Sequence, residues 1–291
     1  MKVLFDALEA RSDLDRSRVE DVILGCVTQA GEQAANIGKT SLLFAGWPSS
    51  IPGITISRYC SSGLDAINFA ALKVGAGQAS VALAGGVEMM SRVPMLSDRP
   101  TVFTDVELAT RCRMLMMGSG ADLVASIYGV SRTQADEVAL ESQRRAARAR
   151  AEGWFRSIVA VWNPKKGITV EQDECIRPDT TLAELAKLEP SFAGLGATGA
   201  DALQLAAHPD VGEICHIHTA GNSPAMADGA ALTLIGDESL RNEGLQPRAR
   251  FVDAVSICGN PLEVISGCAV ATQQLMKKCG LSSMAVDLFE L

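Results

Sequence analysis

Residues 54–84 constrain the fold of this chain more than any other stretch, because strand, helix and strand patterns follow one another there. Apolar alternation over residues 54–57 indicates a strand that leads into a turn. Residues 61–63 are poor strand formers and are favoured at helix starts. Apolar residues then recur at helical spacing up to Gly75, and residues 79–84 are typical of a short buried strand. The pattern predicts an α/β fold built on a right-handed strand–helix–strand unit.

Cys60 lies at the turn between the first strand and the helix of this unit. Ligands of open α/β sheets bind at such turns. A thiol at a helix start also faces the positive end of the helix dipole, which favours the reactive thiolate. A lone cysteine in an apolar segment is otherwise commonly buried as core filler. Cys60 is therefore a candidate nucleophile, with a structural thiol as the alternative.

Charge and composition restrict the partners of the chain. Its net charge of -8 argues against nucleic acid as the main partner, because phosphate binding needs a basic surface. Apolar residues make up 47% and charged residues 21%, as in a globular protein. No apolar run is long enough to span a membrane, and the N-terminal residues lack the pattern of a signal peptide. The eight cysteines are scattered without a CxxC pair, which predicts reduced thiols in the cytoplasm.

The three histidines lie close together in the sequence, at His208, His216 and His218. Residues 215–218 (CHIH) resemble part of a metal site. If they form a strand, however, neighbouring side chains point to opposite faces, and no second pair of ligands matches them. We therefore predict no metal site, and we interpret His208 as a surface residue.

The remaining pattern predicts alternating strands and helices at both ends of the chain. In the middle of the chain this alternation is weaker. The expected strands are residues 22–27, 232–236, 249–257 and 286–291, and the expected helices are 36–45, 132–152 and 262–279. Between residues 96 and 213 the alternation weakens, and a Gly- and Ala-rich stretch covers residues 191–199. We interpret this middle part as an inserted lobe.

Three motifs resemble those of the thiolases, the acetyl-CoA acetyltransferases and 3-ketoacyl-CoA thiolases. They are residues 58–64 (RYCSSGL), 85–95 (GGVEMMSRVPM) and 219–231, which contains TAGN and DGAA. The resemblance implies a layered αβαβα core with an inserted loop domain, and it implies that Cys60 is the acylated nucleophile. The implied domains are an N-terminal half (residues 1–95 and 214–245), a coenzyme A-binding loop domain (96–213) and the start of a C-terminal half (246–291).

The resemblance also implies contacts with coenzyme A. By position, Met117 matches a methionine that packs against the molecule, and Arg177 matches an arginine near the adenine nucleotide. Phe192 and Ala220 match residues along the tunnel for the pantetheine arm. The alternative for Met117 and Phe192 is that they belong to the core of the lobe.

The chain also departs from the thiolase pattern. A serine that contacts the pantetheine arm is replaced by Pro224, the glycine after it by Ala225, and a serine of the nucleotide region by Glu184. The Asn-Glu-Ala-Phe and Gly-His-Pro motifs and the second catalytic cysteine would follow residue 291, and the family's first strand would precede residue 1. We therefore expect a thiolase truncated at both ends, with apolar faces left uncovered.

The expected function is acyl transfer between Cys60 and coenzyme A, in thiolysis of 3-ketoacyl-CoA or condensation of acetyl-CoA, as in fatty acid β-oxidation. Acyl-CoA and CoA are then substrates, with no cofactor bound permanently. The resemblance suggests a cytoplasmic homodimer or tetramer. Turnover is expected to be impaired without the missing base and second cysteine. The alternatives are a non-catalytic acyl-CoA binding protein and a remnant that needs a partner chain to fold.

Overall fold

The computed structural model describes residues 1–290, and Leu291 lies outside the described residues. The chain forms two compact units, each built from separate stretches of sequence. The first unit comprises Met1–Arg99, Ser157–Gln172 and Met226–Val252, and the second comprises Pro100–Arg156, Asp173–Ala225 and Asp253–Leu291. The three domains expected from the sequence stay a prediction, because the units follow contacts within this chain alone.

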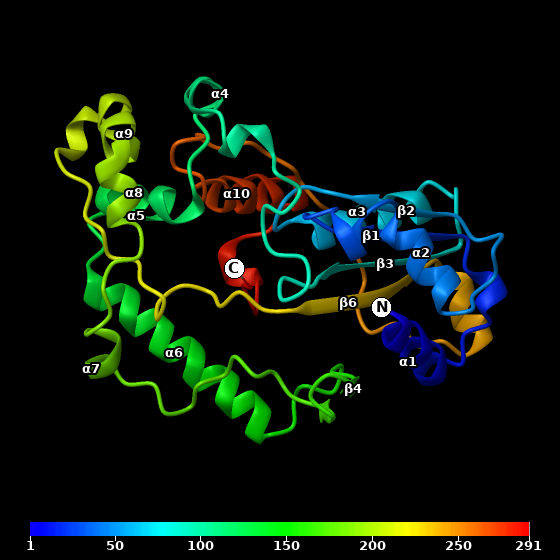
Figure 1. Ribbon diagram of the computed structural model, residues 1–291. Coiled ribbons are helices and arrows are strands. Elements are labelled where there is room, and N and C mark those ends of the chain that lie inside the picture. The colour runs from blue at the N-terminus through cyan, green and yellow to red at the C-terminus, as the bar shows by residue number, and fades with distance from the viewer. Residues whose placement is uncertain (291) are drawn as a thin grey trace. The chain divides into compact units, whose positions relative to one another are not determined.

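A four-stranded sheet forms the centre of the first unit (Figure 1). Its strands lie in the order β2-β1-β3-β6, and β1 runs parallel to both of its neighbours while β6 is antiparallel to β3. Their bounds are Asp21–Gly25 (β1), Gly53–Ile56 (β2), Val81–Glu88 (β3) and Gly229–Gly236 (β6). The α/β class predicted from the sequence is confirmed.

Helix α3 (Ser62–Gly75) connects the parallel strands β2 and β3 and covers one face of the sheet, as Figure 1 shows. Ile23 of β1 packs there against Ala66 and Ala70 of the helix and Ala82 and Ala84 of β3. Alanines are small enough to bring the helix close to the strands. The strand–helix–strand unit expected over residues 54–84 is therefore confirmed in its elements.

The opposite face of the sheet carries larger side chains. Because side chains alternate along a strand, the residues next to Ile23 point away from α3. They pack with α1 (Lys2–Ser12) and α2 (Ile37–Phe44) in a core that includes Phe5, Leu14, Val22, Leu24, Leu42, Trp47, Val81 and Leu83. Period-two alternation thus builds both hydrophobic layers from the same strands.

Two glycines let the start of α3 approach the sheet. A Cβ atom on Gly25 would lie 2.6 Å from the backbone nitrogen of Gly63, and one on Gly86 would lie 3.4 Å from its Cα atom. Gly25 has no room for a side chain without movement of the backbone, whereas a Cβ atom on Gly86 would make ordinary contact with the helix and be tight only against the Gly25 carbonyl, at 3.2 Å. The first turn of α3, and the Cys60 turn before it, are thus held directly against β1 and β3.

The second unit is mainly helical. Its helices are α4 (Val106–Cys112), α5 (Met117–Tyr128), α6 (Arg132–Ala151), α7 (Leu182–Leu185), α8 (Ala193–Leu195), α9 (Asp201–Ala207) and α10 (Gly267–Cys279), and a π-helical turn at Gly196–Ala200 leads into α9. Its buried core centres on Leu123, Ile214 and Leu262. Helix α6 begins with a capping box formed by Ser131 and Gln134, which explains why the predicted helix starts where it does.

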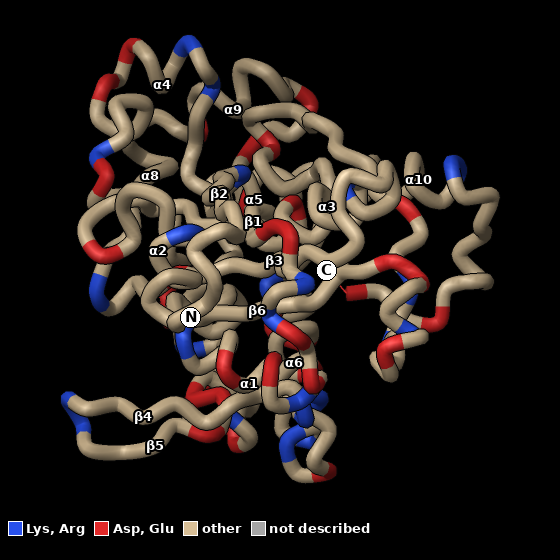
Figure 2. The backbone as a smooth tube through the Cα atoms, turned by 90° about the vertical axis from the view of Figure 1, so that its right-hand side faces the viewer, with Lys and Arg blue, Asp and Glu red and all other residues tan. Residues whose placement is uncertain are grey.

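Short 3₁₀ segments and a hairpin complete the described structure. The 3₁₀ segments are Arg16–Arg18, Gly31–Gln33, Thr101–Phe103, Pro209–Val211, Glu238–Glu243 and Ser283–Ala285. Strands β4 (Val161–Asn163) and β5 (Ile168–Val170) form a hairpin in the first unit, with basic residues at its tip (Figure 2). No helix among residues 1–290 is long and apolar enough to cross a membrane.

Two predicted strands are wrong. Residues 249–257 and 286–290 form no strand. A strand requires a neighbour that completes its hydrogen-bond ladder, and apolar composition alone does not supply one. Within the second unit, Asp253 instead accepts a hydrogen bond from Lys278 of α10 at 2.6 Å. The predicted helix 262–279 begins only at Gly267, because residues 261–265 form turns and bends with Val264 in the left-handed region at φ 55°.

The close contact between Gly25 and the start of α3 can be tested by substitution. We expect Gly25→Ala to lower the free energy of unfolding by about 1–3 kcal/mol, because the added methyl overpacks the helix start. Gly75→Ala is the matched control: it ends the same helix in open space, so it should leave stability unchanged or raise it slightly. Urea unfolding of both variants measures the difference, and equal stability of the two variants would contradict the close contact between Gly25 and the start of α3.

Candidate active site

Cys60 is exposed and lies two residues before the first residue of α3. The core-filler alternative for this cysteine is therefore wrong. The preceding residue, Tyr59, has a left-handed backbone with φ 48°, which is strained for a bulky side chain. Backbone strain of this kind clusters at functional turns, where the surrounding structure maintains it.

Hydrogen bonds maintain the strained turn. The hydroxyl of Ser62 accepts a hydrogen bond from the Arg58 N–H at 2.7 Å and donates one to the Tyr59 carbonyl at 2.6 Å. The Arg58 guanidinium also forms an ion pair with Asp65, a buried residue in the first turn of α3. The turn is thus fixed to the helix on both sides of Cys60.

The backbone donors next to Cys60 are partly occupied. The N–H groups of Ser61 and Ser62 donate to the carbonyls of Arg58 and Tyr59 at 3.1 and 3.0 Å. These two donors already close the turn, so they are not free to stabilise an oxyanion.

Cys26 shows the contrasting environment within the first unit. It is buried at the end of β1, and burial, reinforced by the nearby Glu88 carboxylate, raises its pKa to about 11. Gln33 bridges the two, with its side-chain nitrogen 3.5 Å from the Cys26 sulfur and 2.7 Å from a Glu88 oxygen. Cys26 therefore remains a protonated structural thiol, and it is buried where Cys60 is exposed.

The second and third sequence motifs meet in the first unit. The N–H and hydroxyl of Ser91 donate to the two carboxylate oxygens of Asp228 at 2.9 and 2.6 Å. Gly85 of β3 lies so close to the Ala231 carbonyl of β6 that a Cβ atom would overlap it. The glycine and aspartate of these motifs therefore join β3 to β6.

Met117 and Phe192 lie next to each other in the second unit. Met117 is the first residue of α5, with half of its surface exposed. The Phe192 ring lies over Gly118, where a Cβ atom would overlap it. The glycine after Met117 therefore creates the place that the ring occupies.

Ala220 is exposed in a turn that Asn222 closes. The Asn222 side chain accepts a hydrogen bond from the Thr219 N–H at 2.7 Å and donates to Asp136 of α6 at 2.9 Å. Gly221 lies against α7, because a Cβ atom there would be 2.6 Å from Leu185. The TAGN motif is thus a tightly held loop that presents Ala220 at its surface.

One backbone hydrogen bond connects this loop to the Phe192 segment. The Ser191 N–H donates to the His218 carbonyl at 2.8 Å. The segments that carry Met117, Phe192 and Ala220 are therefore connected through Gly118, Ser191 and His218. Arg177 is exposed elsewhere in the same unit, where its N–H donates to Gln143 of α6 at 2.6 Å, while Cys60 belongs to the first unit.

The sequence-based prediction missed Asp122, which organises the second unit. It is fully buried and accepts four hydrogen bonds, from the side chains of His216 and His218 and from the backbone N–H groups of Ile217 and His218. Burial opposes its negative charge, but these hydrogen bonds outweigh burial and lower the pKa of Asp122. The sequence did contain a signal for this role, because Asp122 is the single charged residue of the helix α5.

The interpretation of residues 215–218 as a strand is also wrong, because they form no strand and both histidines turn to the same carboxylate. The histidine nitrogens instead donate hydrogen bonds to carboxylates. His216 donates to Asp122 and Asp201, and His218 donates to Asp122. Among residues 1–290 no group of three or more His, Cys, Asp and Glu side chains has the geometry of a metal site.

Glu184, one of the departures from the thiolase pattern, has a structural role. It occupies the first turn of α7, and its N–H donates to the hydroxyl of the N-cap residue Thr181 at 3.3 Å. The Thr181 hydroxyl in turn donates to the Glu184 carboxylate at 3.1 Å. The carboxylate therefore stabilises a helix start.

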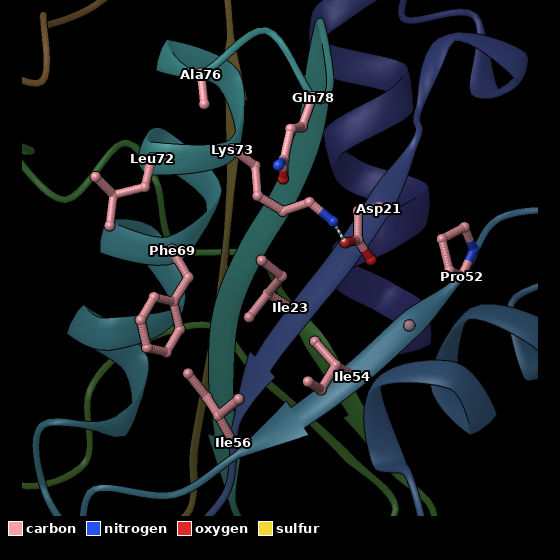
Figure 3. A pocket seen from close by; sticks show the side chains of 11 residues that line it. Asp21, Ile23, Pro52, Ile54, Ile56, Phe69, Leu72, Lys73, Ala76 and Gln78 are labelled. Carbon is pink, nitrogen blue, oxygen red and sulfur yellow. Dashed lines mark hydrogen bonds and ion pairs between the residues drawn. The ribbon is translucent and has the colours of Figure 1, made fainter.

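A hollow of 610 Å³ lies in the first unit between α3 and β2 (Figure 3). Phe69 and Leu72 of the helix and Ile54 and Ile56 of the strand line it, and the ion pair between Lys73 and Asp21 lies at one end. Cys60 is not among its lining residues. The hollow is thus an uncovered apolar part of the α3 face, separate from the Cys60 turn.

Comparison with known proteins matches this arrangement to one family. The model of the "Thiolase, N-terminal domain" matches residues 1–206. A "Beta-ketoadipyl-CoA thiolase" of Pseudomonas aeruginosa is 37% identical, with 98% of this chain and 71% of that protein covered. A "3-ketoacyl-CoA thiolase" of Aliivibrio fischeri is 35% identical, with 98% and 70% covered.

The chain belongs to the thiolase family. It is accordingly an acyltransferase of the acyl-CoA class, as the sequence predicted. The thiolase-like fold expected from the three motifs is confirmed as well. The chain spans about 70% of the length of the relatives it matches.

The closure of the TAGN loop gives a direct test. Asn222→Asp should lower the free energy of unfolding of the second unit by roughly 2–4 kcal/mol, because it replaces an N–H donor with a charge facing the buried Asp136 carboxylate. Gln273→Glu is the control, since Gln273 is an exposed amide on α10 of the same unit. Thermal unfolding compares the two, and equal midpoints would refute the role of Asn222.

Proposed function

We propose that Cys60 is the nucleophile that accepts the acyl group. The observation that carries this proposal is an exposed thiol in a strained turn, fixed between β2 and the start of α3. Its position before the first turn of α3 places it at the partial positive end of the helix, which stabilises negative charge that develops nearby. A rigid turn also keeps the sulfur in one orientation for attack on a carbonyl carbon.

The proposed reaction proceeds in two transfers. In thiolysis, the Cys60 sulfur bonds to the 3-keto carbon of the substrate, the bond between that carbon and the α-carbon breaks, and the released carbanion takes up a proton to leave as acetyl-CoA. The CoA thiolate then attacks the acyl-enzyme, which releases the shortened acyl-CoA and the Cys60 thiolate. Condensation of acetyl-CoA is the same sequence in reverse.

We propose that Met117, Phe192 and Ala220 contact the pantetheine arm of coenzyme A and that Arg177 contacts its nucleotide end. The contacts between Gly118 and Phe192 and between Ser191 and His218 support the first three as one surface. The exposed guanidinium of Arg177 suits a phosphate. Acyl-CoA and CoA are substrates of this site, not permanently bound groups.

The substrate class, setting and assembly are proposals as well. The named relatives support a 3-ketoacyl-CoA substrate, as used in β-oxidation of fatty acids. Eight free cysteines support a reducing, cytoplasmic setting. The apolar hollow beside α3 supports a homodimer or tetramer, because a partner would cover side chains such as Phe69 and Leu72. We also propose that residues 96–213 form a coenzyme A-binding loop domain between two partial halves of the core.

One observation favours a second candidate, an acyl-CoA binding protein with impaired turnover. All three histidines of the chain belong to the second unit, so none is part of the unit that holds Cys60. Asp122 and Asp201 already engage His216, and His218 donates to Asp122. A general base for Cys60 is thus not evident within the first unit.

An acyl-enzyme trap tests the nucleophile. The full chain is incubated with acetoacetyl-CoA, quenched in acid and digested, and mass spectrometry should find acetyl on the peptide that contains Cys60. Cys60→Ser should remove at least 90% of that label (roughly a tenfold loss or more), because hydroxyl is a far weaker nucleophile without a base. Cys112→Ser, at another exposed cysteine, should leave it unchanged.

Two further outcomes decide between the candidates. Binding of CoA in calorimetry without acetyl on Cys60, while iodoacetamide still labels that thiol, would favour the binding protein. Acetyl on other cysteines in proportion to their exposure would overturn Cys60 as the nucleophile.

A further inference from the structure

His216 has a carboxylate at each of its ring nitrogens. Its Nδ1 lies 2.8 Å from an oxygen of Asp122 on α5, and its Nε2 lies 3.1 Å from an oxygen of Asp201 on α9. Ionised carboxylates only accept hydrogen bonds, so both nitrogens must carry a proton for both contacts to form. The geometry thus requires the cationic imidazolium.

Both carboxylates depend on this cation to different degrees. Asp122 keeps three other hydrogen bonds if His216 loses a proton. Asp201 has no such reserve, because its second oxygen is buried without a hydrogen-bond partner among the described residues. Deprotonation at Nε2 would leave a lone pair of His216 facing the Asp201 carboxylate. The hydrogen bond between His216 and Asp201 of α9 is therefore lost first.

The two sides of this contact lead to the candidate coenzyme A surface. Asp201 lies against Gly196, where a Cβ atom would be 2.5 Å from its oxygens, and the Gly196 N–H donates to the Phe192 carbonyl at 3.0 Å. On the other side, Asp122 belongs to the helix that begins at Met117. The Phe192 segment is therefore held from α9 and from α5, with His216 between the two carboxylates.

We propose that His216 is a positioning residue, which in its cationic form joins Asp122 to Asp201 and so holds Phe192 and the TAGN loop in place for coenzyme A. We call this set of contacts the His216 clamp. The inference rests on the proposed coenzyme A site. The groups that face His216 are Asp122 from α5 and Asp201 from α9, and His218 shares the Asp122 carboxylate.

The pH dependence follows from the sign of the shift. Burial opposes the charged form of His216, but the hydrogen bonds to Asp122 and Asp201 outweigh it and raise the pKa of His216. A group with a raised pKa stabilises the clamped state fully at pH below its ordinary pKa, and that contribution is lost as pH rises through the raised value. Affinity for coenzyme A should therefore fall as pH rises above the ordinary pKa of histidine and through the raised value.

The test measures binding of desulfo-CoA, which lacks the thiol and its own titration, by calorimetry from about pH 6 to about pH 9. We expect the wild-type affinity to fall roughly three- to tenfold over this range, the size that loss of one hydrogen bond in the clamp gives. His216→Gln should bind weakly at every pH. His208→Gln, a control at a half-buried histidine of the same unit, should follow the wild type.

Asp201→Asn is a second variant that keeps the size of the side chain. It should move the midpoint of the affinity curve to lower pH, because only one carboxylate then favours the cation. Hydrogen exchange of residues 191–204 is measured in parallel without any ligand, and it should quicken in His216→Gln at about pH 6 but not in His208→Gln.

Wild-type affinity and pH dependence in His216→Gln would overturn the inference. Absence of desulfo-CoA binding at every pH would overturn the proposed coenzyme A site instead, and the inference that His216 positions it falls with that site. Hydrogen exchange then shows separately whether the clamp exists: unchanged exchange in His216→Gln would exclude the clamp itself.

Discussion

The close approach of α3 to the sheet is the constraint on which the first unit depends. Gly25 leaves no room for a side chain beneath the first turn of the helix, and a Cβ atom on Gly86 would crowd the Gly25 carbonyl at 3.2 Å. The distance between the helix start and strands β1 and β3 is therefore fixed, and the turn before the helix can adopt few conformations. Ser62, in the first turn of that helix, holds the strained Tyr59 turn with two hydrogen bonds and leaves Cys60 exposed.

Buried carboxylates have the corresponding role in the second unit. Asp122 and Asp136 are both almost inaccessible, and each receives hydrogen bonds from the segment that ends in the TAGN loop. A buried charge is costly unless it is paired, so once formed these contacts define one arrangement of the loop. The surface around Phe192 and Ala220 is consequently set by polar contacts more than by the small apolar core at Leu123.

The sequence was informative where local pattern and tertiary contact agree. The alternation around Ile23 and the helical spacing after Ser62 predicted the strands and helix that form. It failed at residues 249–257, where apolar composition suggested a strand without a partner to complete a ladder. It also failed at residues 215–218, where spacing alone could not show that both histidines turn to one carboxylate.

By itself, the sequence determined the α/β class, the strand–helix–strand unit and Cys60 as the candidate nucleophile, because these follow from short-range periodicity and from turn residues beside a thiol. Three motifs in order determined the family. Only the tertiary structure decided which polar side chains hold the site. Asp122, Asp201 and His216 are far apart in sequence, and no local pattern encodes which carboxylate meets which ring nitrogen. That pairing depends on where α5 and α9 pack within the second unit, which the chain specifies only once it is folded.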